Sequence, residues 1–114
     1  MSITIKDNTD EFLSAFEKAI ENGLIAIGMT AEGHAKRKIT DYPAVDTGRL
    51  RNSITYAVKA DEKAVYIGTN VEYAPYVELG TRKMRARPFL KPAATEHNDE
   101  YKKIMEAALK SAEE

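Results

Sequence analysis

The sequence predicts an α+β fold in which a small antiparallel sheet, built on a β-hairpin, is packed by a long N-terminal helix and a C-terminal helix. Two observations predict it. Apolar residues recur every three or four positions towards both ends of the chain, as on a helix, and they alternate over residues 53–69, as on strands. The chain has 114 residues, of which 43% are hydrophobic and 31% charged, so residues 1–114 are expected to form a single domain with one core.

The first apolar stripe predicts a helix over residues 9–42, and residues 1–8 are interpreted as a strand or an ordered arm. The stripe consists of residues three or four apart, namely Phe12, Phe16, Ile20, Leu24, Ile27, Ala31, Ala35 and Ile39. Pro43 ends it, because proline cannot continue a helix. About thirty helical residues span about 45 Å, which is more than a compact domain of this size. The helix therefore either breaks at a glycine or projects towards a partner, unless the glycines mark close packing against another backbone; they are Gly23, Gly28 and Gly33.

Residues 53–69 predict a β-hairpin, with Ile54, Tyr56 and Val58 on one face and a polar turn at residues 61–63. Two strands alone are marginally stable, so the sheet requires a covering helix or further strands, for which residues 2–6 and 83–87 are the candidates. Before the hairpin, a short helical turn that reaches Asn52 is expected, with Asp46 as its N-cap. The residues expected to hold this local structure are Asp46, Thr47, Gly48 and Leu50.

Residues 70–91 predict an ordered connector that contains a short helix from Pro75 to Leu79. Pro75 suits the first helical position, and Gly80 suits the position after the last one, where φ is often positive. From Thr81 the backbone is expected to be extended, and Pro88 restricts the residue before it. Gly80, Thr81 and Pro88 are therefore interpreted as structural residues. A final helix is predicted over residues 92–112 from a second stripe: Ala94, His97, Tyr101, Ile104, Met105, Ala108, Leu109 and Ala112.

The sequence contains no catalytic motif, so the chain is interpreted as a non-enzyme that uses neither a cofactor nor a metal. There is no HExxH, no Walker lysine, no GxGxxG and no cysteine. His34 and His97 lie far apart on two predicted helices, and neither shows a carboxylate or a second histidine at metal-ligand spacing, so each is interpreted as a partly buried helix residue. No apolar run approaches the ~20 residues that cross a bilayer, so no membrane partner is expected.

Charge is unevenly distributed along the chain, although the net charge is only −1. Residues 1–35 carry two basic and six acidic side chains, residues 36–91 carry twelve and six, and residues 92–114 carry three and six. Such segregation suggests charge-complementary contacts between copies or with a neighbour, with a solvated surface whose signs happen to segregate as the alternative. The basic strip itself contains no acidic residue; its members are Arg82, Lys83, Arg85, Arg87 and Lys91.

This strip allows two interpretations. It could neutralise the phosphates of a nucleic acid, or its arginines could pair with carboxylates, either within the domain at Glu72 and Glu78 or across a subunit contact. The low net charge favours pairing over nucleic-acid binding. The connector also supplies the residue types in which interface energy concentrates. The interface hypothesis therefore includes Tyr73, Tyr76, Glu78, Arg82, Arg85, Arg87 and Phe89, with a core role as the alternative for Tyr73 and Phe89 above all.

Three motifs occur in order along the chain: PAVDTGRLRNSI (43–54), GTNVEYAPYVELGT (68–81) and RPFLKPA (87–93). Together they resemble the small tail-component proteins, of the head-to-tail joining or tail-completion type, of tailed double-stranded DNA phages and prophages. The resemblance covers residues 10–112. It implies a structural protein of the virion neck or tail that is made in the cytoplasm of the bacterial host. It further implies docking to neighbouring neck and tail proteins, and a ring-forming homo-oligomer in the virion from a protein that is a monomer or weak oligomer when isolated.

Overall fold

The computed structural model describes residues 5–42 and 47–112, and it confirms the predicted α+β class. Three short helices lie between the long first helix and the last one, one before the hairpin and two after it. The elements in chain order are α1 (Ile5–Thr40), α2 (Thr47–Ser53), β1 (Thr55–Lys59), the 3₁₀ turn η1 (Ala60–Glu62), β2 (Ala64–Gly68), α3 (Ala74–Leu79), α4 (Leu90–Thr95) and α5 (Asn98–Ala112).

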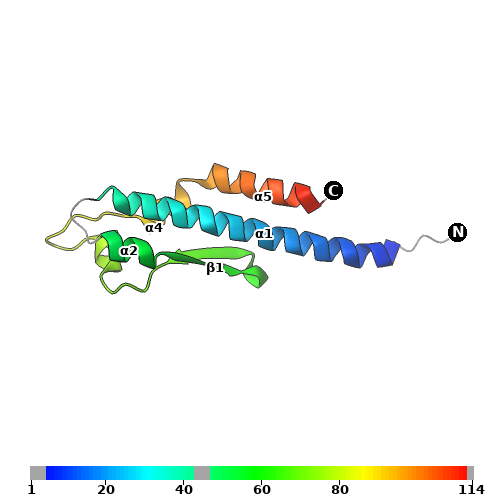
Figure 1. Ribbon diagram of the computed structural model, residues 1–114, viewed down its shortest axis with the longest axis horizontal. Helices are drawn as coiled ribbons and strands as arrows, with labels where there is room; N and C mark the ends of the chain where they lie inside the picture. The colour runs from blue at the N-terminus through cyan, green and yellow to red at the C-terminus, as the bar shows by residue number, and fades with distance from the viewer. Residues whose placement is uncertain (1–4, 43–46, 113–114) are drawn as a thin grey trace.

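The elements form three layers with α1 in the middle. The hairpin lies along one side of α1 and α5 lies along the other (Figure 1). The result is a rod with extents of 75 × 23 × 21 Å. The part of the connector that joins α3 to α4 lies at one end of the rod. At the other end, the N-terminal end of α1 extends past both α5 and the hairpin (Figure 1).

The helix α1 is continuous over 36 residues and its N-terminal end projects, so the predicted break at a glycine is wrong; the partner expected for the projecting end stays a prediction. Two of its glycines instead provide space for neighbouring side chains. A Cβ at Gly23 would lie 2.7 Å from Met105 Sδ of α5, and a Cβ at Gly28 would lie 2.5 Å from Tyr56 Cδ2 of β1. These glycines therefore allow α5 and the hairpin to approach α1 from opposite sides.

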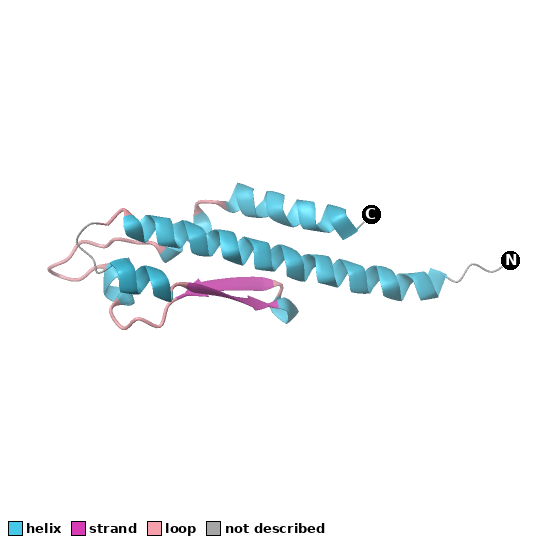
Figure 2. Ribbon diagram, in the orientation of Figure 1, coloured by secondary structure: helices cyan, strands magenta, loops and turns pink. Residues whose placement is uncertain are grey.

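The sheet consists of β1 and β2, paired antiparallel with Thr55 opposite Gly68 and Lys59 opposite Ala64 (Figure 2). Ile54, Tyr56 and Val58 face inwards as predicted, since Thr55, Ala57 and Lys59 between them are exposed. The covering helix that a two-stranded sheet requires is α1. The candidates for additional strands are wrong: residues 5–8 form the first turns of α1, and residues 83–87 are irregular, while residues 1–4 lie outside the described part.

The core lies at the C-terminal end of α1, where α2, α3 and α4 converge on it. Its largest members are fully buried: Ile39, Leu50, Ile54 and Phe89. Along the predicted stripe of α1, burial decreases towards the N-terminus, from Ala35 and Ile39 at 0% exposure to Phe16 at 37%. The apolar stripe of α1 is thus longer than the part of α1 that the other described elements cover.

Residues 92–112, predicted as one helix, form parts of two helices. α4 begins at Leu90, ahead of Pro92, and ends at Thr95 before α5 starts at Asn98. Pro92 still lies in the first turn of α4, where its missing N–H costs no helical hydrogen bond. The cap predicted for Asp46 lies outside the described residues. The helix that it was expected to start is α2, in which Leu50 reaches the core.

Candidate docking surface

The connector is held to the fold by the side chain of Glu78, in the last turn of α3. Glu78 Oε1 accepts the backbone N–H groups of Phe89 at 3.0 Å and Leu90 at 2.9 Å, and Oε2 accepts that of Lys91 at 3.2 Å. The first N–H groups of a helix have no partner within it, and a carboxylate there also suits the helix dipole. Glu78, 11 residues before Phe89, therefore caps the N-terminus of α4.

Backbone bonds shape the rest of the connector. Gly80 adopts φ 79° and ψ 173°, and its N–H donates to Tyr76 O at 2.8 Å, which ends α3 as predicted. Thr81 N–H donates to Met84 O, while Thr81 Oγ1 accepts the N–H groups of Lys83 and Met84. Arg87 N–H donates to Val77 O at 2.7 Å and returns the chain to α3. The connector is thus an ordered loop, as predicted.

Several residues of the interface hypothesis are directed inwards. Phe89 is 0% exposed in the core, and Tyr73 packs against the core with the Arg49 guanidinium carbon 5.6 Å from its ring centroid. Pro88 O accepts the Tyr42 hydroxyl at 2.8 Å, which fixes the start of α4 to the end of α1. Within the described residues, Arg87 Nη1 is buried without a hydrogen-bond partner. These residues therefore attach the connector to the core of the domain.

Other residues of the hypothesis face solvent. Tyr76 is 59% exposed and Leu79, beside it on α3, is 77% exposed. Arg82, Lys83 and Arg85 are exposed and form no ion pair with any residue that the structure describes. The predicted pairing with Glu72 or Glu78 is therefore wrong for Arg82 and Arg85. Glu78 binds backbone instead, and Glu72 binds Arg49 through two contacts of 3.1 and 2.9 Å.

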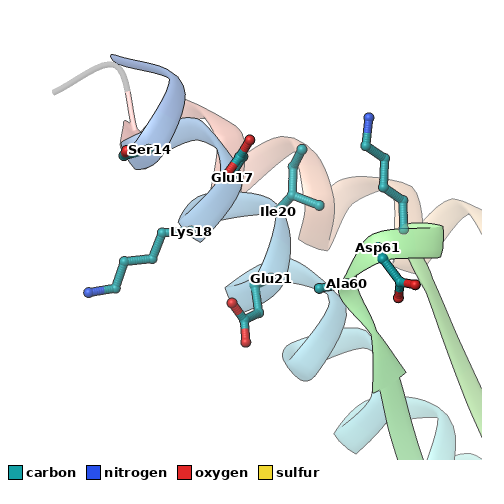
Figure 3. A pocket seen from close by; sticks show the side chains of 8 residues that line it. Ser14, Glu17, Lys18, Ile20, Glu21, Ala60 and Asp61 are labelled. Atoms are coloured by element: carbon teal, nitrogen blue, oxygen red, sulfur yellow. The ribbon is translucent and has the colours of Figure 1, made fainter. Parts of the chain in front are cut away.

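A second exposed surface lies farther along the rod, beside the tip of the hairpin. There α1 passes the tip of the hairpin and leaves an open groove of about 540 Å³ (Figure 3). Its lining combines three carboxylates with two ammonium groups and one isoleucine; it consists of Ser14, Glu17, Lys18, Ile20, Glu21, Ala60, Asp61 and Lys63. Lys18 points away from the hairpin in Figure 3. Leu13 and Phe16, in the same N-terminal part of α1, are 49% and 37% exposed. This surface thus combines charged side chains of both signs, with one more carboxylate than ammonium group in the groove, and exposed apolar side chains.

The two histidines lie together, which the sequence interpretation missed. Their rings stack with centroids 3.5 Å apart and planes 4° apart, where α1 meets the start of α5. His34 Nε2 lies 3.0 Å from Glu100 Oε1, and Arg37 Nη2 lies 2.7 Å from His34 Nδ1. The available signal was local: Glu100 follows His97 by three residues, which places both on one side of a helix start.

In the part of the chain that the structure describes, the pKa values of Glu72, Tyr66 and Tyr101 are shifted, each with a local cause. The pKa of Glu72 is lowered by a hydrogen bond from its own backbone N–H and by Arg49. The pKa of Tyr66 is raised by its hydrogen bond to the Glu62 carboxylate. Burial raises the pKa of Tyr101, whose hydroxyl donates to Ala93 O, and the charge of Glu100 adds to the shift. None of the three lies in the exposed basic strip, so these shifts indicate local structure.

The comparison with protein families gives a match over residues 4–80, to the family described as "Bacteriophage HK97-gp10, putative tail-component". The matched range contains the first motif, all but the last residue of the second, α1, the hairpin and α3, and it ends before the third motif. No curated protein and no solved structure matches the chain. Among the described residues, no helix has the length and apolar character needed to cross a membrane.

The match covers more than half of the chain and agrees with the motifs read from the sequence. The chain therefore belongs to the HK97 gp10-like family of bacteriophage tail components.

Proposed function

We propose that this protein acts at the head-to-tail junction of a tailed phage or prophage, as a non-enzymatic tail-completion or tail-terminator component that works by docking and oligomerisation. The observation that carries the proposal is the exposed connector. An ordered framework presents Arg82, Lys83 and Arg85 without carboxylate partners among the described residues, next to the exposed Tyr76 and Leu79. Arginine and tyrosine are enriched where interface energy concentrates.

Two surfaces of the rod, one at its end and one beside the hairpin tip, differ in charge. The connector end is basic, whereas the groove beside the hairpin tip contains three carboxylates (Glu17, Glu21 and Asp61) against two ammonium groups (Figures 1 and 3). A contact between different patches on two copies is heterologous, and it closes into a ring when the rotation between copies allows. We therefore propose that, in the assembled virion, the connector of one copy docks on the N-terminal part of α1 of the next copy, at the groove that Glu17 and Glu21 line. Isolated protein should remain a monomer or weak oligomer, which light scattering over a concentration series tests.

The main experiment compares two triple variants of equal charge change. Arg82→Gln/Lys83→Gln/Arg85→Gln removes the connector cations, and Lys102→Gln/Lys103→Gln/Lys110→Gln removes three exposed cations of α5. Each variant is supplied in trans to a phage that lacks the gene, and particles are counted by electron microscopy. The connector variant should give mostly unjoined heads and tails with an unchanged Tm, while the α5 variant should assemble normally. Normal joining by the connector variant would overturn the proposal.

A charge swap tests whether the partner is a second copy. Arg82→Glu/Arg85→Glu should block assembly, and adding Glu17→Lys/Glu21→Lys to the same chain should restore part of it, because the new charges complement each other. If Glu17→Lys/Glu21→Lys alone assembles normally and rescues nothing, the connector docks on another neck or tail protein instead. Tyr76→Ala, at an exposed position, should weaken assembly without loss of thermal stability.

The same three unpaired cations also favour a second function, binding of a nucleic-acid backbone. A gel-shift titration over a salt series separates the two. Neutralisation of three phosphates predicts a log–log slope of about −2.7 that the connector variant abolishes. Binding that is weak and independent of the connector charges would exclude this function.

A further inference from the structure

We propose that His34, His97 and Glu100 form a binding site for a divalent transition ion of the Zn²⁺ type. Their candidate ligand atoms all lie within 4.8 Å of one another. His34 comes from α1, His97 from the linker before α5, and Glu100 from the first turn of α5. Two imidazole nitrogens and one carboxylate oxygen suit Zn²⁺ in preference to Mg²⁺ or Ca²⁺, which favour oxygen ligands. The site goes beyond the proposed assembly role.

The distance between His34 and Glu100 is already close to the distance between two ligands of one metal ion. Nε2 and Oε1 are 3.0 Å apart, and the His34 side chain is only 13% exposed. Ligands at the usual Zn–N and Zn–O distances of about 2.0–2.1 Å lie about 3.3 Å apart in a tetrahedral site. An ion can therefore replace the shared proton with a small outward movement of Glu100, whose side chain is 47% exposed.

The second histidine must rotate to complete the set. The ring planes of His34 and His97 are 4° apart, so their in-plane lone pairs do not converge as the rings stand. His97 lies in the linker between α4 and α5, and it borders an open hollow lined by residues 95–100. The hollow gives its ring space to turn. With three protein ligands, a fourth position remains for water, and the ion would fix the start of α5 to α1.

Arg37 makes the proposal specific, because it should oppose metal binding. A guanidinium can only donate, so its contact with His34 Nδ1 at 2.7 Å makes that nitrogen an acceptor and leaves the proton on Nε2, towards Glu100. An ion on Nε2 moves the proton to Nδ1, where Arg37 cannot accept it. Arg37 is exposed and must then swing away, so its removal should tighten binding.

The test is a calorimetric titration of the full-length protein with Zn²⁺ alone, with visible absorption of Co²⁺ as a second measure of tetrahedral coordination. Wild type should bind one ion per chain. Glu100→Gln and His97→Gln should each bind at least about 10-fold more weakly, and Arg37→Met about 10-fold more tightly, on the scale by which surrounding groups alter metal affinity. The matched control is Asp99→Asn, a neighbouring carboxylate outside the set, which should bind as wild type.

Two results would overturn the site. One is the absence of binding by wild type at millimolar Zn²⁺. The other is equal binding by wild type, Glu100→Gln and His97→Gln, which would indicate non-specific surface carboxylates. Circular dichroism of each metal-free variant checks folding. The increased affinity of Arg37→Met provides a measure that loss of folding cannot produce. Because phage assembly plays no part in the titration, its outcome is independent of the proposed function.

Discussion

The carboxylate of Glu78 accepts the backbone N–H of Phe89 at 3.0 Å, and this contact joins the end of α3 to the start of α4. Phe89 is buried in the core, so the same bond positions the largest fully buried side chain among the described residues. Between these two residues the chain presents the exposed cations Arg82, Lys83 and Arg85. The stability of the fold and the presentation of these cations therefore depend on one side chain.

Glu78→Ala should lower the free energy of unfolding by about 2–3 kcal/mol, because it removes hydrogen bonds to a charged acceptor and the cap of α4. Urea denaturation measures this change. The matched control is Glu72→Ala, which breaks the exposed ion pair with Arg49 and should cost much less. Equal losses for the two variants would show that the cap contributes little.

Gly80→Ala should lower the free energy of unfolding by at least about 1–3 kcal/mol, since the backbone at φ 79° and ψ 173° is accessible almost only to glycine. The new Cβ would also lie 2.7 Å from Ala86 N. Gly48→Ala is the control, because nothing lies within 4 Å of its Cβ on α2. Thermal unfolding should show a lower Tm for Gly80→Ala and an unchanged or higher one for Gly48→Ala.

Two glycines of α1 should respond in opposite directions. Gly28→Ala places a Cβ 2.5 Å from Tyr56 Cδ2 and 2.9 Å from Val65 Cγ2, so overpacking of about 1–3 kcal/mol should exceed the helix-propensity gain. Gly33→Ala meets nothing within 4 Å and should stabilise the protein by about 0.5–1 kcal/mol. Chemical denaturation of both variants tests this, and stabilisation by Gly28→Ala would contradict the close packing of the hairpin on α1.

Acid should remove the contribution of Glu72. Its folded-state pKa lies below the ordinary value of 4.5, so the ionised group contributes stability above that value, and the contribution is lost as the pH falls through the folded-state pKa. Glu72→Gln should therefore be slightly less stable than wild type at neutral pH and equal to it in strong acid. Because the pair is exposed, added salt should reduce the difference at neutral pH. A difference that grows in acid would contradict this assignment.

Local periodicity was sufficient to predict most of the elements. The stripe from Phe16 to Ile39 predicted a helix because side chains three and four apart share a face, and the alternation around Tyr56 predicted a strand. Gly80 was recognised because helix ends favour a residue that tolerates positive φ. The break before α5 was missed although its signal was local: Asn98, Asp99 and Glu100 are residue types that favour a helix start.

Contacts distant in sequence could not be predicted in the same way. Glu78 looks like any exposed glutamate until α4 is placed beside it, and its role depends on a contact 11 residues away. The contact between His34 and Glu100 spans 66 residues and depends on how α5 is rotated against α1. Periodicity identifies which side of a helix is apolar, but it does not identify the neighbour on that side.

The projecting end of α1 has a thermodynamic consequence. Every side chain from Leu13 to Lys18 is exposed, so tertiary packing stabilises the helix less in this stretch than near its C-terminal end. Amide hydrogen exchange should therefore slow progressively from this end towards Ile39 as local opening becomes global unfolding. Any molecule that binds this part of α1 as a helix must shift its helix–coil equilibrium towards the helix. Its affinity would then depend on helix propensity even at positions that the partner never touches.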